Sequence, residues 1–518
     1  MARGFIWCCD RYFVTLLVET ITDMAGIKSL AKDTAIYGIS SIVGRFLNWC
    51  LVPLYTNVFA SDQYGMVTFI YSIVALLYIV LTYGMETGFF RFSNHEKWHD
   101  AKEVYSTTLI SLATTSIAFT AAVALLLKPL SAATGCVDHP SFVMMMGACV
   151  AIDAFTAIPF SYLRQRQQPM RFAILKLVNI GLNIGLNLFF LVLCPMLGDA
   201  MQWIYKPEFG IGYIFLSNLI ASAVNLLLMR SELTGFRWKF NGKLLSEMLR
   251  YSAPLLILGI AGIMNQTIDK VIYPWLVDDP AEAMRGLGIY GANYKIGIVM
   301  LMFIQAFRFA YEPFIFQRSK AEGEDRSAAY RDAMKYFCLF STFIFLAVMF
   351  YIDILKYFIA PSYFEGLKVV PIVMAAEVFF GIFFNLSLWY KLTDKTMWGA
   401  YFSIFGLCIT LTLNILLVPH VGYIGCAWAA FCSYGSMMLA SYFIGRRHMA
   451  VNYQVGRILC YFALGAVLYY AGFYGLQTLP LAVRLTLRTV LLAAFLVVVL
   501  RYEPLPLPGR LRKYLGKC

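Results

Sequence analysis

Long apolar stretches recur along almost the entire chain, and no other feature constrains the fold as strongly. Fourteen stretches of roughly 20 residues lie between residues 34 and 500, and each is about long enough to cross a hydrocarbon layer as a helix. They are continuously apolar and too long for tilted β-strands, in which polar and apolar residues alternate. Because backbone groups inside a lipid layer must bond to one another, we expect an all-α membrane protein with about 14 transmembrane helices.

Charge clusters and Pro/Gly pairs separate these stretches from one another. The predicted spans lie near 34–58, 64–90, 104–127, 141–163, 172–194, 208–229, 252–276, 287–311, 334–352, 366–390, 397–418, 422–444, 455–475 and 482–500. The composition agrees with this prediction, since 60% of the 518 residues are hydrophobic and only 14% are charged. A soluble protein of this length could not bury so much apolar surface. The polar connections are short, so no separate soluble domain is expected.

Lysines and arginines are distributed unevenly between alternate connections. The connections on the side of the N-terminal segment hold 28 of them, whereas those on the other side hold four. These four are Lys128, Lys206, Arg285 and Lys356. Positive residues accumulate in cytoplasmic loops, so we expect both termini in the cytoplasm. Most of the net charge of +13 is then a signal of orientation, and no nucleic-acid partner is expected.

The two halves of the chain show a weak internal repeat. Each half places a basic residue, Arg45 or Lys270, inside its opening span, and a Tyr-Gly pair at the start of the next span. This predicts two pseudo-symmetric six-helix lobes followed by two C-terminal helices. The expected parts are an N-terminal segment over 1–33 with an alternative start at Met24, an N-lobe over 34–229, a basic linker over 230–251, a C-lobe over 252–444, two helices over 455–500 and a basic tail over 501–518.

Three segments carry a resemblance to a known family. They are SLAKDTAIYGISSIVGRFLNWCLVPLYTNVF, TYGMETGFFRF and IPFSYLRQRQQPMRFAILKLVNIGLNIGLNLFF. With them the chain resembles the polysaccharide and O-antigen flippases of the multidrug/oligosaccharidyl-lipid/polysaccharide exporter superfamily. The resemblance implies two lobes around a central cavity, alternating access, and a lipid-linked oligosaccharide on undecaprenyl diphosphate as substrate. It also implies a bacterial inner membrane, a role in lipopolysaccharide synthesis, and polysaccharide polymerase and glycosyltransferases as partners beside the membrane lipids.

Basic residues occur inside several predicted spans, where a charge costs roughly 2.5–3.5 kcal/mol. Four of them are interpreted as a cationic substrate-binding cavity for a diphosphate: Arg45, Lys270, Lys295 and Arg308. Arginine grips phosphate oxygens bidentately, while lysine supplies a mobile point charge. Four others lie closer to the span ends and are expected to extend to the membrane surface: Lys176, Lys335, Lys368 and Arg457.

Carboxylates and amides complete the set of candidate site residues. Five carboxylates are candidate counter-ions, or groups that couple transport to H⁺ or Na⁺: Glu86, Asp153, Asp269, Glu312 and Glu377. The structural alternative for each is a simple ion pair. Three amides, Asn179, Asn183 and Asn187, line one helical face and alternate with Gly181 and Gly185. They either support close helix packing or form a polar stripe that binds sugar hydroxyls.

Motifs for catalysis are absent from the sequence. There is no P-loop, G-x-G-x-x-G, H-E-x-x-H or G-x-S-x-G, so we expect no enzyme, no cofactor and no metal. The leading hypothesis is a transporter that flips undecaprenyl-diphosphate-linked repeat units from the cytoplasmic to the outer leaflet. The alternative is a cation-coupled multidrug exporter of the same superfamily, which should prefer an acidic cavity. A membrane glycosyltransferase would need large outer loops, and the outer connections here are short.

Overall fold

The computed structural model is built from α-helices, and it describes residues 42–94, 100–234, 238–318, 324–393, 395–449 and 451–503. Within these ranges there is no β-strand, and twelve helices are long and apolar enough to cross a membrane. A thirteenth, shorter apolar helix coincides with the predicted span at 208–229. The all-α membrane fold is therefore confirmed. The predicted segment 1–33, the start of the first span and residues 504–518 lie outside the described residues.

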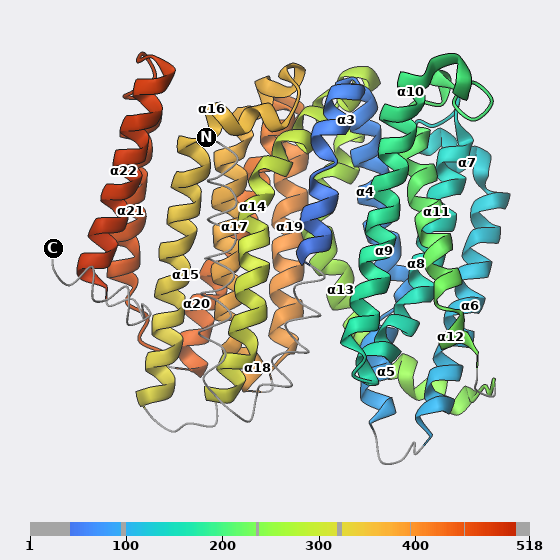
Figure 1. Ribbon diagram of the computed structural model, residues 1–518. Helices are drawn as coiled ribbons and strands as arrows, with labels where there is room; N and C mark the ends of the chain where they lie inside the picture. Colours follow the sequence, from blue (N-terminus) through green and yellow to red (C-terminus); the bar gives the residue numbers. More distant parts are fainter. Residues whose placement is uncertain are drawn as a thin grey trace. The chain divides into compact units, whose positions relative to one another are not determined.

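The chain divides into two compact units (Figure 1). The first contains Leu77–Leu256 together with the described residues up to Leu51. Its helices are the helical residues 42–49, the end of α4 (Ser61–Thr82), α5 (Met85–Ser93), α6 (Ala101–Leu125), α7 (Leu127–Ala133), α8 (Pro140–Gln165), α9 (Pro169–Leu188), α10 (Cys194–Leu197), α11 (Gly212–Leu228), α12 (Arg230–Leu233) and the start of α13 (Gly242–Leu276).

A break between α4 and α5 shapes the core of the first unit. Tyr83 and Gly84 both have positive φ angles, 32° and 72°, which interrupt the helix and start α5 in a new direction. The left-handed conformation favours glycine, and a Cβ at Gly84 would also lie only 3.2 Å from the Ser252 carbonyl oxygen. As a result α5 packs closely on α13, where Met85 and Met248 belong to one buried cluster.

The second unit contains Val52–Leu76 and the described residues from Ile257 onward. Its complete helices are α3 (Val52–Val58), α14 (Pro280–Arg318), α15 (Glu324–Phe350), α16 (Ile352–Leu355), α17 (Val369–Leu386), α18 (Leu388–Leu392), α19 (Met397–Val421), α20 (Tyr423–His448), α21 (Val455–Phe473) and α22 (Leu481–Tyr502). Helices α4 and α13 are each shared between the two units. The compact units thus divide the chain differently from the predicted N-lobe at 34–229 and C-lobe at 252–444.

Two glycines explain why the start of α4 belongs to the second unit. A Cβ at Gly65 would lie 1.9 Å from the Met284 carbonyl oxygen, and a Cβ at Gly288 would lie 1.8 Å from the Ser61 carbonyl oxygen. Helices α4 and α14 therefore touch backbone to backbone, and any side chain at either position would separate them. A hydrogen bond of 2.9 Å from the Tyr363 hydroxyl to the Phe59 carbonyl oxygen also fixes the chain just before α4 within the second unit.

The C-terminal hairpin of α21 and α22 packs against α15 (Figure 1). Arg488 of α22 is only 2% exposed. Its Nη1 atom lies 2.7 Å from an Asp353 carboxylate oxygen, and its Nε atom donates to the Gly472 carbonyl oxygen at 2.8 Å. A buried guanidinium needs several acceptors at once, so the residue joins three segments of the unit at this end of the hairpin.

A second ion pair fastens the other end of this hairpin. Glu503, just after α22, accepts from Lys335 of α15 at 2.6 Å and from the Tyr461 hydroxyl of α21 at 2.9 Å. Lys335 is 5% exposed, so the prediction that it extends to the membrane surface is wrong. The physical reason is the buried carboxylate of Glu503, which offers a partner that local sequence does not reveal.

Candidate functional site

Two oppositely charged residues lie next to each other inside the second unit. Asp269 and Lys270 occupy consecutive positions on α13 and are 5% and 8% exposed. The Lys270 Nζ atom lies 3.1 Å from both carboxylate oxygens of Asp269, and it also donates to the Gln266 carbonyl oxygen at 3.1 Å. Burial of a single charge is costly, whereas a hydrogen-bonded pair is tolerated. Asp269 is therefore the internal counter-ion of Lys270.

Two tyrosines of α14 surround this ion pair. The Tyr290 hydroxyl donates to Asp269 at 2.8 Å, and the centroid of the Tyr294 ring lies 4.3 Å from Lys270 Nζ. Tyr294 in turn donates a 2.9 Å hydrogen bond to Glu377 of α17, which is 3% exposed. The i, i+4 spacing puts both phenol rings on one face of α14, so one helix contacts both carboxylates and the ammonium group.

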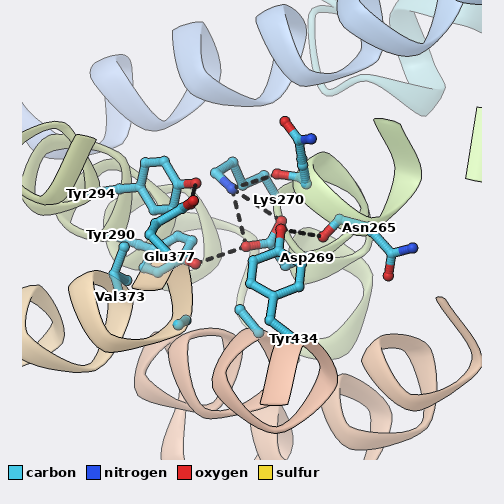
Figure 2. Close-up of a pocket in the computed structure, with 11 residues that line it drawn as sticks. Asn265, Asp269, Lys270, Tyr290, Tyr294, Val373, Glu377 and Tyr434 are labelled. Carbon is cyan, nitrogen blue, oxygen red and sulfur yellow. Dashed lines mark hydrogen bonds and ion pairs between the residues drawn. The ribbon is translucent and has the colours of Figure 1, made fainter. Parts of the chain in front are cut away.

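These groups line a narrow pocket whose free space holds on the order of one water molecule (Figure 2). Asn265 and Tyr434 close it from α13 and α20, and the Tyr434 hydroxyl donates to the Asn265 carbonyl oxygen at 3.2 Å. Two carboxylates face one ammonium group here, so the pocket is acidic overall when both are ionised. Its size and charge suit a proton or a small cation, and it has no room for a sugar.

The remaining basic candidates of the second unit lie elsewhere. Lys295 is partly exposed on α14, and Arg308 is exposed farther along the same helix. The Arg308 guanidinium carbon lies 4.4 Å from the centroid of the Phe384 ring, and Lys391 Nζ lies 4.5 Å from that centroid. Neither Lys295 nor Arg308 is among the residues that line the pocket of Lys270. Lys270 therefore lies in a buried acidic pocket, whereas exposed Arg308 and partly exposed Lys391 flank one aromatic ring. Lys295 lines neither place, although it interacts electrostatically with Lys270.

The first unit contains Arg45, Glu86 and Asp153. Arg45 is exposed on the helical residues 42–49, and it belongs to a different unit from Lys270. Asp153 of α8 accepts a 2.7 Å hydrogen bond from Ser222 of α11. Glu86 of α5 forms an ion pair of 2.9 Å with an arginine of α8. Each carboxylate thus has a partner within its own unit. Glu312 lies on α14, but its side chain is outside the described part of the structure.

The three amides of α9 face the protein and not open space. Asn183 and Asn187 are 8% and 0% exposed, and Asn187 donates to the side chain of Asn183 at 3.1 Å. Asn179 donates to the Ala221 carbonyl oxygen of α11 at 3.1 Å. The interleaved glycines are exposed, and a Cβ at either would meet nothing within 4 Å. Within the described residues, helix α11 therefore contacts the amide face, and the two glycines lie away from that contact.

Two kinds of site residue escaped prediction from the sequence. Tyr290 and Tyr294 looked like ordinary aromatic residues, although their i, i+4 spacing could have indicated a shared face. Arg164 lies at the end of a predicted span, and only the fold shows that it contacts Glu86. Lys176, expected at the membrane surface, has its Nζ atom 3.9 Å from the centroid of the Phe160 ring within the first unit.

Residues 30–318 match the family described as polysaccharide biosynthesis protein. The chain belongs to this family. That match covers more than half of the sequence and confirms the resemblance that the three segments indicated. No curated protein matches the sequence.

Solved structures identify the fold that this family member adopts. The lipid II flippase MurJ in an inward closed conformation matches with a TM-score of 0.70 at 12% identity, over 90% of this chain and 98% of that chain. An inward-facing multidrug resistance MATE family transporter of the MOP superfamily matches with a TM-score of 0.62 at 14% identity, over 80% of this chain and 97% of that chain. The protein therefore has the fold shared by flippases and multidrug transporters, and it is a multi-pass membrane protein.

Proposed function

We propose that the protein flips undecaprenyl-diphosphate-linked oligosaccharide repeat units from the cytoplasmic to the outer leaflet of a bacterial inner membrane. The observation that carries this proposal is membership of the polysaccharide biosynthesis protein family over residues 30–318. The fold shared with MurJ, which is named as a lipid II flippase, supports the same class of substrate. In this role both termini lie in the cytoplasm, glycosyltransferases supply the substrate, and a polysaccharide polymerase consumes the product for lipopolysaccharide and O-antigen synthesis.

The substrate is anionic at its diphosphate and apolar along its lipid chain. Moving the diphosphate through a layer without water is the difficult step, and cationic side chains lower that barrier. We assign this contact to Arg45 and Arg308, which are exposed, and to Lys295, which is partly exposed. Lys270 is held by Asp269, so we assign it to control of the buried pocket instead of direct substrate contact. Alternating access then carries the bound headgroup across.

The buried pocket of the second unit suggests how transport is driven. The sequence contains no P-loop, and consumption of the product or an ion gradient are the two remaining sources of energy. We infer from the acidic pocket that a gradient of H⁺ or Na⁺ contributes. Asp269, Glu377 and the tyrosine hydroxyls provide the oxygen ligands that such a cation needs, in a space of the right size. The same acidic pocket favours the alternative function, a cation-coupled multidrug exporter, because the MATE family transporter shares the fold.

A complementation experiment separates the two functions. The chain is expressed in a bacterium that lacks its own polysaccharide flippase and, separately, in one that lacks its multidrug exporters. We expect surface glycan to return in the first strain and no gain of drug resistance in the second. Arg45→Ala should reduce glycan export several-fold at unchanged protein abundance, with Arg166→Ala as a matched exposed arginine. Drug resistance without glycan export would reject the flippase and establish the exporter.

A further inference from the structure

The first unit contains a half-exposed ion pair between α8 and α5. Arg164 of α8 and Glu86 of α5 are 36% and 35% exposed at their side chains, and their closest atoms are 2.9 Å apart. A charge that faces lipid tails is costly, so the exposed part of this pair must face water or lipid headgroups. Arg164 lies in the last turn of α8, at the end that the distribution of lysines and arginines assigns to the cytoplasm.

The arginine has more hydrogen-bonding capacity than this pair uses. Only its Nη2 atom contacts the Glu86 carboxylate, and the same atom donates to the Ser161 hydroxyl at 3.1 Å. Its Nε atom is buried and has no hydrogen-bond partner in the described structure. A guanidinium presents five N–H donors in a planar fork that matches two phosphate oxygens. An anion with several oxygens would therefore satisfy Arg164 better than the single oxygen of Glu86 does.

Neighbouring groups make this place favourable for an anion. The Lys176 ammonium interacts electrostatically with Asp153 first and then with Glu86 and Arg164, and it lies 3.9 Å from the centroid of the Phe160 ring. Asp153 therefore compensates the charge of Lys176, and Glu86 compensates the charge of Arg164. When the Glu86 side chain turns away, the positive charge of Arg164 loses its carboxylate partner. This is the electrostatic condition for binding a diphosphate.

The break between α4 and α5 sets the position of Glu86. It lies in the first turn of α5, immediately after the left-handed pair Tyr83 and Gly84. A positive φ at a tyrosine is a strained conformation, and such breaks are points where helices change direction. The other contacts of Glu86 are weak, since the Tyr78 and Ser161 hydroxyls are both 3.4 Å from its carboxylate.

We propose that Arg164 binds the diphosphate of an incoming lipid-linked substrate, and that Glu86 occupies this arginine until the diphosphate displaces it. The choice of a lipid-linked substrate rests on the proposed function, whereas the anion site rests on the contacts above. A lipid held in the inner leaflet has its phosphates at the membrane surface, which is the depth of the last turn of α8. The pair therefore acts as an entry site, and the Arg164–Glu86 ion pair breaks when the diphosphate binds.

Binding experiments on the purified full-length protein in nanodiscs test this proposal. The probes are farnesyl diphosphate, inorganic pyrophosphate and farnesol, measured by isothermal titration calorimetry. Arg164→Ala should weaken binding of farnesyl diphosphate about tenfold or more, whereas Glu86→Gln should strengthen it about threefold. Arg166→Ala is the control, since this exposed arginine lies two residues away, and it should change binding less than twofold. A loss of binding in Arg164→Ala could come from misfolding, but a gain of affinity in Glu86→Gln could not. The second variant therefore tests the proposal even if the first does not fold.

The remaining outcomes decide between the anion site, the lipid headgroup and the flippase function. Unchanged binding in Arg164→Ala, or weaker binding in Glu86→Gln, would show that the pair is only structural. Equal affinity for pyrophosphate and farnesyl diphosphate would assign the site to a free diphosphate and reject the lipid headgroup. If wild-type protein restores glycan export and both variants bind and export like it, the site is wrong and the flippase function stands. If export is never restored but diphosphate binding depends on Arg164, the flippase function fails and the anion site stands.

Discussion

Removal of one charge from the buried ion pair on α13 should change the free energy of unfolding by an amount that follows directly from the structure. Lys270→Met keeps the approximate length of the side chain and removes its charge, so Asp269 remains buried with the Tyr290 hydroxyl as its hydrogen-bond donor from another helix. Removing one partner of a buried pair typically costs about 3–5 kcal/mol, because the other charge loses its compensation. Asp269→Asn should cost a similar amount, since it leaves the ammonium group unpaired.

The double variant distinguishes charge from packing. Lys270→Met with Asp269→Asn leaves no unpaired charge, so we expect it to recover at least half of the stability that either single variant loses. In detergent, an entropy of unfolding of about 2.1 cal/mol/K for each of the 518 residues converts a loss of about 3–5 kcal/mol to a decrease of roughly 3–5 °C in melting temperature, measured by size-exclusion fluorescence after heating. Additive losses in the double variant would refute the reasoning, because they would mean that the two charges do not compensate each other.

Three further predictions concern other parts of the fold. Gly65→Ala should lower the melting temperature by several degrees, because its Cβ would meet the Met284 carbonyl oxygen at 1.9 Å. The control Gly181→Ala should leave the melting temperature unchanged, and equal effects of the two substitutions would contradict the close contact of α4 and α14. Arg488→Leu should expose the C-terminal hairpin to limited proteolysis, and a wild-type digestion pattern would show that the ion pair does not fasten it. Glu377→Gln should reduce glycan export about tenfold at normal abundance; full export would exclude this carboxylate from coupling.

The sequence predicted the helices well because lipid imposes a simple rule on them. Every spanning segment must be long and apolar, so hydropathy located all of the spans that the described residues cover. The adjacency of Asp269 and Lys270 was also visible, because consecutive residues of the sequence are neighbours on a helix. The partners of Lys335 and Arg164 were not visible, because Glu503 and Glu86 are distant in the sequence and only tertiary packing brings them close.

Local rules also misjudged the environment of some residues. The glycines among the amides of α9 fit a packing motif, but the helix presents its asparagine face to α11. Periodicity shows which residues share a face and does not show which face meets a neighbour. Similarly, the positive φ of Tyr83 has no signature in the sequence, although it determines where Glu86 lies. Such details follow from the packing of α5 on α13, which no single segment specifies.

Flipping by the purified protein is the most direct test of the central claim. Proteoliposomes would contain the chain and a short-chain polyprenyl-diphosphate oligosaccharide with a fluorescent sugar, and a membrane-impermeant quencher would report the fraction in the outer leaflet. We expect exposure of the labelled lipid to increase with the amount of protein and to depend on an imposed H⁺ or Na⁺ gradient. An equal rate in protein-free liposomes, or transport of cationic drugs without movement of the labelled lipid, would contradict the account.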